Sequence, residues 1–97
     1  MATDKMRVLS ALFDGQPVHV DAGDLTIDTD EDGVRGWSAV IVAMIAQQVP
    51  SGAATVEIVT ESGTFRGEAT VEYRELASGG LVSSGYYLTG TGALESE

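Results

Sequence analysis

The most constraining feature of this 97-residue chain is an unbroken alternation of apolar and polar side chains over residues 64–74. Successive side chains of a β-strand point to opposite faces, so this period of two predicts a half-buried strand. Residues 54–60 (ATVEIVT) alternate in the same way and precede it across a glycine-containing turn, which predicts an antiparallel hairpin. The expected apolar face of the second strand consists of Phe65, Gly67, Ala69, Val71 and Tyr73.

The register of this hairpin follows from where the turn is placed. If Ser62-Gly63 forms the turn, Val56 lies opposite Ala69 and the apolar faces of the two strands coincide. The same register sets Glu57 opposite Glu68, which is an unfavourable pair of like charges.

Turn residues recur every eight to twelve residues along the rest of the chain, which is typical of an all-β domain. A first strand over residues 6–13 ends at the turn pair Asp14-Gly15, and residues 24–28 alternate with Leu25 and Ile27 inward. A last strand covers about residues 83–92. We therefore expect one small β-barrel or sandwich domain of six to seven mostly antiparallel strands over residues 1–92, followed by an acidic C-terminal tail, 93–97.

The segment from Trp37 to Gln48 allows two interpretations. Its apolar residues recur at helical spacing and end at Pro50, which indicates an amphipathic helix. Three consecutive β-branched residues, 40–42, instead indicate a strand buried on both faces. The β-branched run favours a strand over Arg35–Ala43, and a short helix around residues 37–48 stays open.

Charge and composition exclude several classes of protein. Fifteen acidic against five basic residues give a net charge of −10, which repels phosphate backbones and anionic membranes, so no nucleic-acid or membrane partner is expected. Cysteine is absent, which excludes disulfides and thiolate metal sites. The longest apolar run, Ala39–Ala46, is too short to span a bilayer, and the expected protein is soluble.

The stretch DTDEDG, residues 28–33, resembles the first half of a calcium loop. Asp28, Asp30 and Asp32 alternate before Gly33, but the twelfth position is Ala39, where such a loop needs a bidentate glutamate. The interpretation favoured here is a hairpin turn with no metal, and whether the three aspartates bind an ion stays open.

No group of residues predicts catalysis. His19 is the only histidine, it is expected to face solvent, and no nucleophile motif accompanies it. We therefore expect no enzyme, no cofactor and no small-molecule substrate. One member of the pair Tyr86-Tyr87 must point away from the core, and an exposed tyrosine is a favoured interface anchor.

The order of these segments over residues 17–92 resembles small β-barrel domains of tailed-phage tail and baseplate proteins. The resemblance implies a structural role in a virion rather than a reaction, and hence a virion location, with a cytoplasmic one otherwise. Phe65 follows the turn glycine by two residues, one fewer than in the family pattern. The matching residues are Gly23, Leu25, Ile27, Val56, Ile58, Gly63, Phe65, Gly67, Thr89 and Gly90.

Three hypotheses for function follow. The first is a virion component of the tail, baseplate or capsid that assembles with itself or a larger protein scaffold through an apolar centre with an acidic rim. The second is an acidic inhibitor that mimics nucleic acid, which needs its carboxylates in a stripe. The third is a calcium-dependent binding module. Basic residues such as Arg66 and Arg74 interrupt the carboxylates and favour the first hypothesis.

Overall fold

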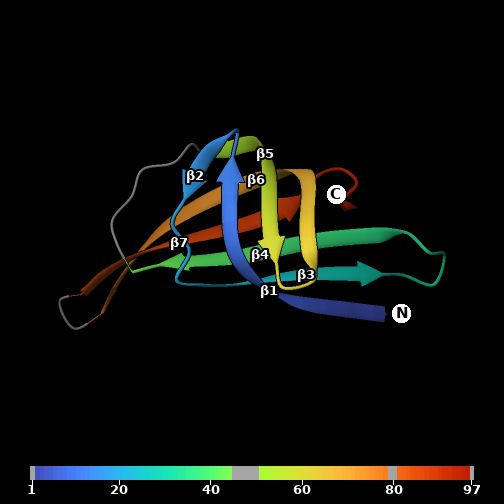
Figure 1. The fold of residues 1–97 in the computed structure, drawn as a ribbon, viewed down its shortest axis with the longest axis horizontal. Helices are drawn as coiled ribbons and strands as arrows, with labels where there is room; N and C mark the ends of the chain where they lie inside the picture. The colour runs from blue at the N-terminus through green and yellow to red at the C-terminus, as the bar shows by residue number, and fades with distance from the viewer. Residues whose placement is uncertain (1, 45–50, 79–80, 97) are drawn as a thin grey trace.

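The computed structural model describes residues 2–44, 51–78 and 81–96. These residues form β-strands joined by turns (Figure 1). They contain no helix, and so none that could cross a membrane. The strands are β1 (Ala2–Phe13), β2 (Gln16–Val18), β3 (Ala22–Thr29), β4 (Arg35–Ala43), β5 (Gly52–Thr60), β6 (Gly63–Ser78), β7 (Leu81–Gly90) and β8 (Glu95–Ser96).

Six of the strands close into an antiparallel barrel in the order β1, β3, β4, β7, β6 and β5, with β5 pairing back onto β1. The short strand β2 pairs with residues 11–13 of β1, and the short strand β8 pairs with Phe65 and Arg66 of β6. The all-β expectation is confirmed, and the alternative between barrel and sandwich resolves to a barrel. The strand expected over Arg35–Ala43 is β4, while residues 45–48 of the alternative helix lie outside the described residues.

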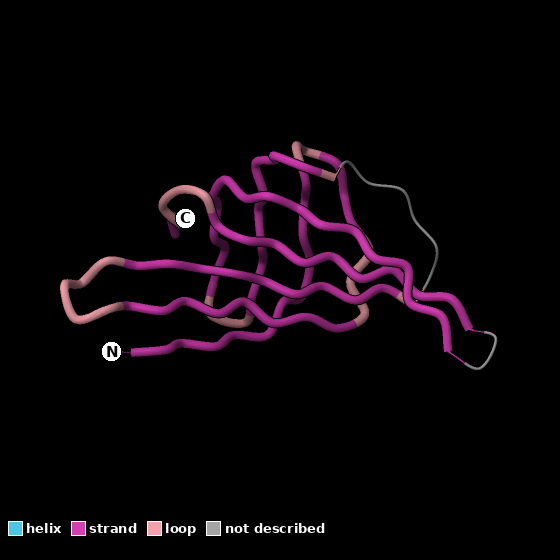
Figure 2. The backbone as a smooth tube through the Cα atoms, turned by 180° about the vertical axis from the view of Figure 1, so that it is seen from behind, coloured by secondary structure: helices cyan, strands magenta, loops and turns pink. Residues whose placement is uncertain are grey.

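Two long strands bend and belong to both walls of the barrel. Residues 2–7 of β1 pair with β3, whereas Val8 and, beyond a bulge at Leu9, residues 10–13 pair with β5. In the same way β6 pairs first with β5 and then with β7. The result is a long layer of β3, β4, β7 and the adjoining ends of β1 and β6, crossed by a short layer built around β5 (Figures 1 and 2).

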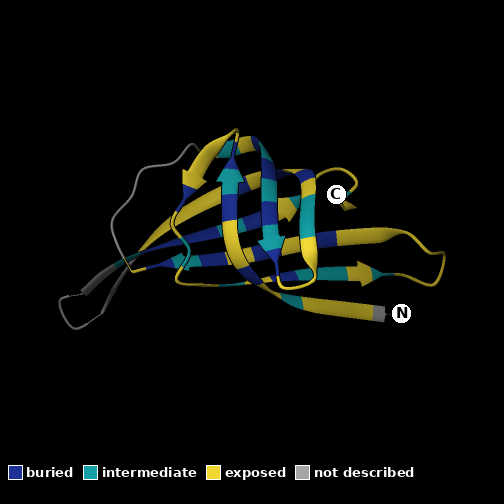
Figure 3. Cartoon of the chain, viewed as in Figure 1, coloured by how far each residue is buried: buried dark blue, intermediate teal, exposed yellow. Residues whose placement is uncertain are grey.

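The core lies between these two layers. Inward side chains alternate with outward ones along the strands, as Figure 3 shows by colour. Tyr86 is fully buried and its ring packs against those of Phe13, at a centroid distance of 5.7 Å, and Tyr73, at 5.3 Å. Tyr87 is therefore the outward member of the tyrosine pair. The largest fully buried side chains are those of Tyr86, Phe13, Leu25, Ile41, Ile58, Leu88 and Val56.

The register of the β5–β6 hairpin differs from the expected one by two residues. Thr60 pairs with Gly63, so the turn is Glu61-Ser62, and the Thr60 hydroxyl accepts a hydrogen bond from the Ser62 N–H. Glu57 consequently lies opposite Arg66, and the predicted Glu57–Glu68 pair is wrong. A shift of two preserves the inward and outward faces, so the hydrophobic pattern could not distinguish the two registers.

Trp37 closes one end of the barrel. Its side chain is 5% exposed and its indole N–H donates a hydrogen bond to the Gly92 carbonyl at 3.0 Å. Leu94 packs against the same core, and β8 then pairs with Phe65 and Arg66 of β6. Within the segment expected as an acidic tail, 93–97, Leu94 is partly buried against the core, and Glu95 and Ser96 pair with β6.

Candidate interaction surface

The outer face of the long layer carries a cluster of outward apolar residues in which Val40 is exposed, Val42 and Tyr87 are half-buried and Gly85 is buried. In β4 the side chains of Ala39, Ile41 and Ala43 fill the core. The intervening Val40 and Val42 therefore point outward. Val40 is 39% exposed and Met44, just beyond the strand, is 57% exposed. The described part of the apolar run predicted at Ala39–Ala46 is thus divided between the core and the surface.

Strand pairing places Tyr87 of β7 directly beside Val40, and Gly85 beside Val42. We call the outward surface of these four residues the β4–β7 patch. The Arg74 guanidinium lies over the Tyr87 ring at 5.0 Å from its centroid. This cation–π contact forms one margin of the patch. The long layer that carries the patch is the layer seen in front in Figure 2.

Charged residues of both signs border the β4–β7 patch. On the β3 side, Asp24 is paired with both Val40 and Arg7, and the Lys5 ammonium lies 3.8 Å from Asp24. On the β6 side, Glu72 is paired with Tyr87 and accepts hydrogen bonds from Arg74 at 3.0 and 3.2 Å. Exposed ion pairs of this kind contribute at most about 1 kcal/mol each to the stability of the fold. Their charges have a larger effect on which partner surfaces can approach the patch.

This border carries both signs of charge, and the acidic rim of an interface stays a prediction. Three of the five basic residues of the chain, Lys5, Arg7 and Arg74, lie here with three of its fifteen acidic ones, Asp21, Asp24 and Glu72. The long-range pairings of β1 with β3 and of β6 with β7 bring them together, and neither pairing is visible in a local pattern.

A row of hydroxyl side chains limits the β4–β7 patch toward the β3–β4 turn. Ser38 is paired with Thr26 on one side and Thr89 on the other, and Thr89 is paired with Thr70. The patch therefore has an apolar centre, charged margins across the strands and a neutral polar margin along them.

The short layer carries shallow polar hollows, one with a volume of about 360 Å³, around Thr55, Arg66 and Glu68. The carboxyl-bearing residues Glu57 and Glu95 are paired with Arg66 from the two neighbouring strands. These hollows offer hydrogen bonds and charge, but the residues that line them include no histidine beside a hydroxyl.

The acidic stretch predicted as a turn is the connection between β3 and β4. One carboxylate oxygen of Asp30 accepts hydrogen bonds from the N–H groups of Asp32 and Val34, both at 2.9 Å, and Gly33 has a positive φ of 80°. Asp28 instead accepts a hydrogen bond from the Thr3 hydroxyl. Within residues 2–44, 51–78 and 81–96, no three histidine, aspartate or glutamate side chains gather closely enough to hold a metal ion.

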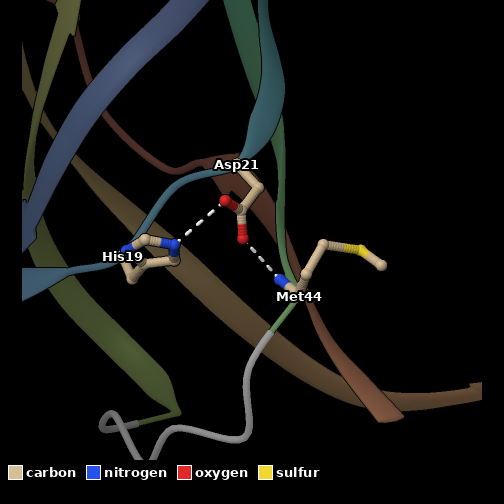
Figure 4. A network of polar contacts seen from close by, with 3 residues as sticks. All are labelled: His19, Asp21 and Met44. Atoms are coloured by element: carbon tan, nitrogen blue, oxygen red, sulfur yellow. Dashed lines mark hydrogen bonds and ion pairs between the residues drawn. The ribbon is translucent and has the colours of Figure 1, made fainter. Parts of the chain in front are cut away.

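His19 is exposed, as predicted, and contacts Asp21 in the connection between β2 and β3. Its Nε2 lies 3.0 Å from one Asp21 oxygen, and the other oxygen accepts a hydrogen bond from the Met44 N–H at 2.6 Å (Figure 4). The hydrogen bond from Met44, followed by the contact with His19, lowers the pKa of Asp21. This network joins the start of β3 to the end of β4, next to the β4–β7 patch.

No protein-family model matches the chain, and neither curated proteins nor solved structures give a match to it.

Proposed function

We propose that this protein is a non-enzymatic assembly component that binds protein through the β4–β7 patch. The observation that carries the proposal is the position of Val40, 39% exposed, beside the outward Tyr87 at the middle of the long layer. Protein interfaces have an apolar, aromatic-rich centre within a polar border, and Tyr and Arg are common energetic anchors in them. Val40, Tyr87 and Arg74 supply that combination.

The position of the β4–β7 patch supports the same proposal. β4 and β7 lie inside the ring with a strand partner on both sides, so their backbone groups are already paired and only their side chains can meet another protein. Residues 2–7 of β1 and 72–78 of β6, in contrast, have a strand partner on one side only within the described part of the chain. The resemblance to tail and baseplate barrels favours a virion as the setting, in which the chain would be one part of a larger particle.

The acidic-mimic alternative needs a continuous stripe of carboxylates. On the short layer Arg66 lies between Glu57 and Glu95 in the strand pairing and interrupts such a stripe. The β4–β7 patch therefore supports docking better than the short layer supports mimicry.

The proposal is tested by replacing Val40 with glutamate in the natural source of the protein. We expect tagged Val40→Glu to elute at the monomer position in size-exclusion chromatography of a native extract, while the wild-type chain elutes in an assembly. Val34→Glu is the matched control, because Val34 is 63% exposed and lies outside the patch. The proposal is wrong if the wild-type chain elutes as a free monomer, or if Val40→Glu stays assembled as fully as Val34→Glu.

A further inference from the structure

We infer that the partner at the β4–β7 patch is a second copy of this chain, packed face to face about a two-fold axis that runs along β4. The inference rests on the proposed function and names its partner. Most soluble homo-oligomers are closed and symmetric, and a two-fold interface uses the same patch on both copies.

Charge distribution favours a second copy at this patch. The chain has a net charge of −10, so two copies repel each other across most orientations. The margins of the β4–β7 patch carry three basic and three acidic side chains, so two copies can meet there with little of this repulsion. A strongly basic partner would be drawn instead to the acidic short layer or to the β3–β4 turn.

The pairing of five strands defines what two copies would present to each other. One row across the long layer reads Arg7, Asp24, Val40, Tyr87 and Glu72, taken from β1, β3, β4, β7 and β6 in turn. A two-fold axis along β4 reverses this row in the second copy, so that β1 of one copy lies over β6 of the other.

In that arrangement each Val40 meets its own equivalent, and the next outward residue of β4, Val42, does the same. Arg7 lies opposite Glu72 of the second copy, and symmetry forms this ion pair twice. Asp24 lies opposite the hydroxyl of Tyr87 of the second copy, which can donate a hydrogen bond to its carboxylate. The arrangement therefore brings the two apolar centres together and gives the charged residues of both margins complementary partners on the second copy.

The charges also select this axis over the other possible one. A two-fold axis running across the strands would keep each residue of the row opposite its own equivalent. Arg7 would then face Arg7, and Glu72 would face Glu72. Like charges placed opposite each other suppress association, so the axis along β4 is the favourable choice.

The flat area of the face, about 600 Å², approaches the area that such an interface buries on each partner. Five strands at a spacing of about 4.8 Å make it about 20 Å wide, and a nine-residue strand such as β4 is about 30 Å long. An ordinary interface buries about 800 Å² per partner, roughly one-seventh of the 5772 Å² exposed by this chain.

The test uses two single charge reversals, Arg7→Glu and Glu72→Arg, each purified alone and then mixed in equal amounts. Each variant alone would place two like-charge pairs in its own dimer, and we expect its self-association to weaken about thirtyfold. In the mixture both pairs become opposite charges again, so a heterodimer should form with close to wild-type affinity. Sedimentation velocity gives the dissociation constants, and native mass spectrometry identifies the heterodimer by mass.

Arg35→Glu, mixed with Glu72→Arg, is the matched control, because it makes the same reversal in the chain outside this row. Circular dichroism and thermal unfolding of each variant establish that the barrel is intact. The two-fold arrangement is refuted if the mixture of Arg7→Glu and Glu72→Arg associates no better than either variant alone. A purified wild-type chain that stays monomeric while assembled in its natural source would also refute the second copy as partner, and would leave the proposed docking role standing.

Discussion

Replacement of Gly90 by alanine tests the closure of the barrel end by Trp37. A Cβ atom at this position would lie 2.3 Å from the indole Nε1 and 2.5 Å from two ring carbons of Trp37. The ring is rigid and is held by its hydrogen bond to the Gly92 carbonyl, so relief of the clash requires the whole side chain to move. The expected change is therefore a loss of packing at this end of the barrel.

The magnitude follows from two contributions. Overpacking of a core typically destabilises by about 1–3 kcal/mol, and loss of the indole hydrogen bond adds about 1 kcal/mol. Together these give about 2–4 kcal/mol, which lowers the melting temperature of a domain of this size by roughly 10–30 °C. Gly36→Ala is the matched control, because nothing lies within 4 Å of a Cβ at Gly36 and its change should stay within about 0.5 kcal/mol.

Thermal unfolding followed by far-UV circular dichroism measures both variants. A double-mutant cycle with Trp37→Leu then isolates the clash, because Gly90→Ala should lose at least half of its effect once the indole is gone. Equal effects of Gly90→Ala and Gly36→Ala would refute the steric argument. A full effect of Gly90→Ala in the Trp37→Leu background would show that the indole is not its cause.

Three further predictions concern the turn, the polar network and the hairpin register. Asp30→Ala removes two hydrogen bonds in the β3–β4 turn and should destabilise the fold by about 1 kcal/mol. Millimolar calcium should raise the wild-type melting temperature no more than magnesium does. A calcium-specific rise that Asp30→Ala abolishes would instead establish a metal site. Because the pKa of Asp21 is lower in the folded state than its ordinary value of 3.8, Asp21 stabilises the fold above that pH and its contribution is lost as the pH falls further. Urea unfolding across acidic pH should show a shallower decline for Asp21→Asn, and parallel declines for the two proteins would contradict this. Arg66→Glu sets like charges opposite each other at Glu57 and should destabilise by about 0.5–1 kcal/mol more than Arg66→Gln in urea unfolding; an equal effect of the two variants would argue against the observed register.

Local patterns in the sequence predicted the strands well because each strand keeps one face in the core. The alternation around Leu25 and the β-branched run of β4 correspond to observed strands. The hairpin register was wrong by two residues, since both registers bury the same faces and only the turn at Glu61-Ser62 decides between them.

The candidate surface was only partly predictable. The apolar run of β4 and one outward tyrosine were expected, and the structure identifies that tyrosine as Tyr87. Glu57, Glu68 and Glu72 all lie on the polar side of the alternating pattern, but the structure divides them between the two layers, because β6 bends after pairing with β5. Bends of this kind depend on contacts between distant segments, and period-two alternation carries no information about them.

The strand order also has a consequence for how the chain folds. β1, β3 and β4 pair in succession through nearby segments, and β5, β6 and β7 do the same. The two halves join along β1 and β5, where Val8 pairs with Thr60, and along β4 and β7, where Ile41 pairs with Tyr86, and these are contacts between residues far apart in the chain. Since distant contacts form slowly, ring closure should limit the folding rate and place it in the range of milliseconds to seconds. The edge strands of each half, β1 and β4 in one and β5 and β7 in the other, complete their hydrogen bonds only with the other half. Separately made N-terminal and C-terminal fragments therefore have complementary strand edges through which they can reassemble.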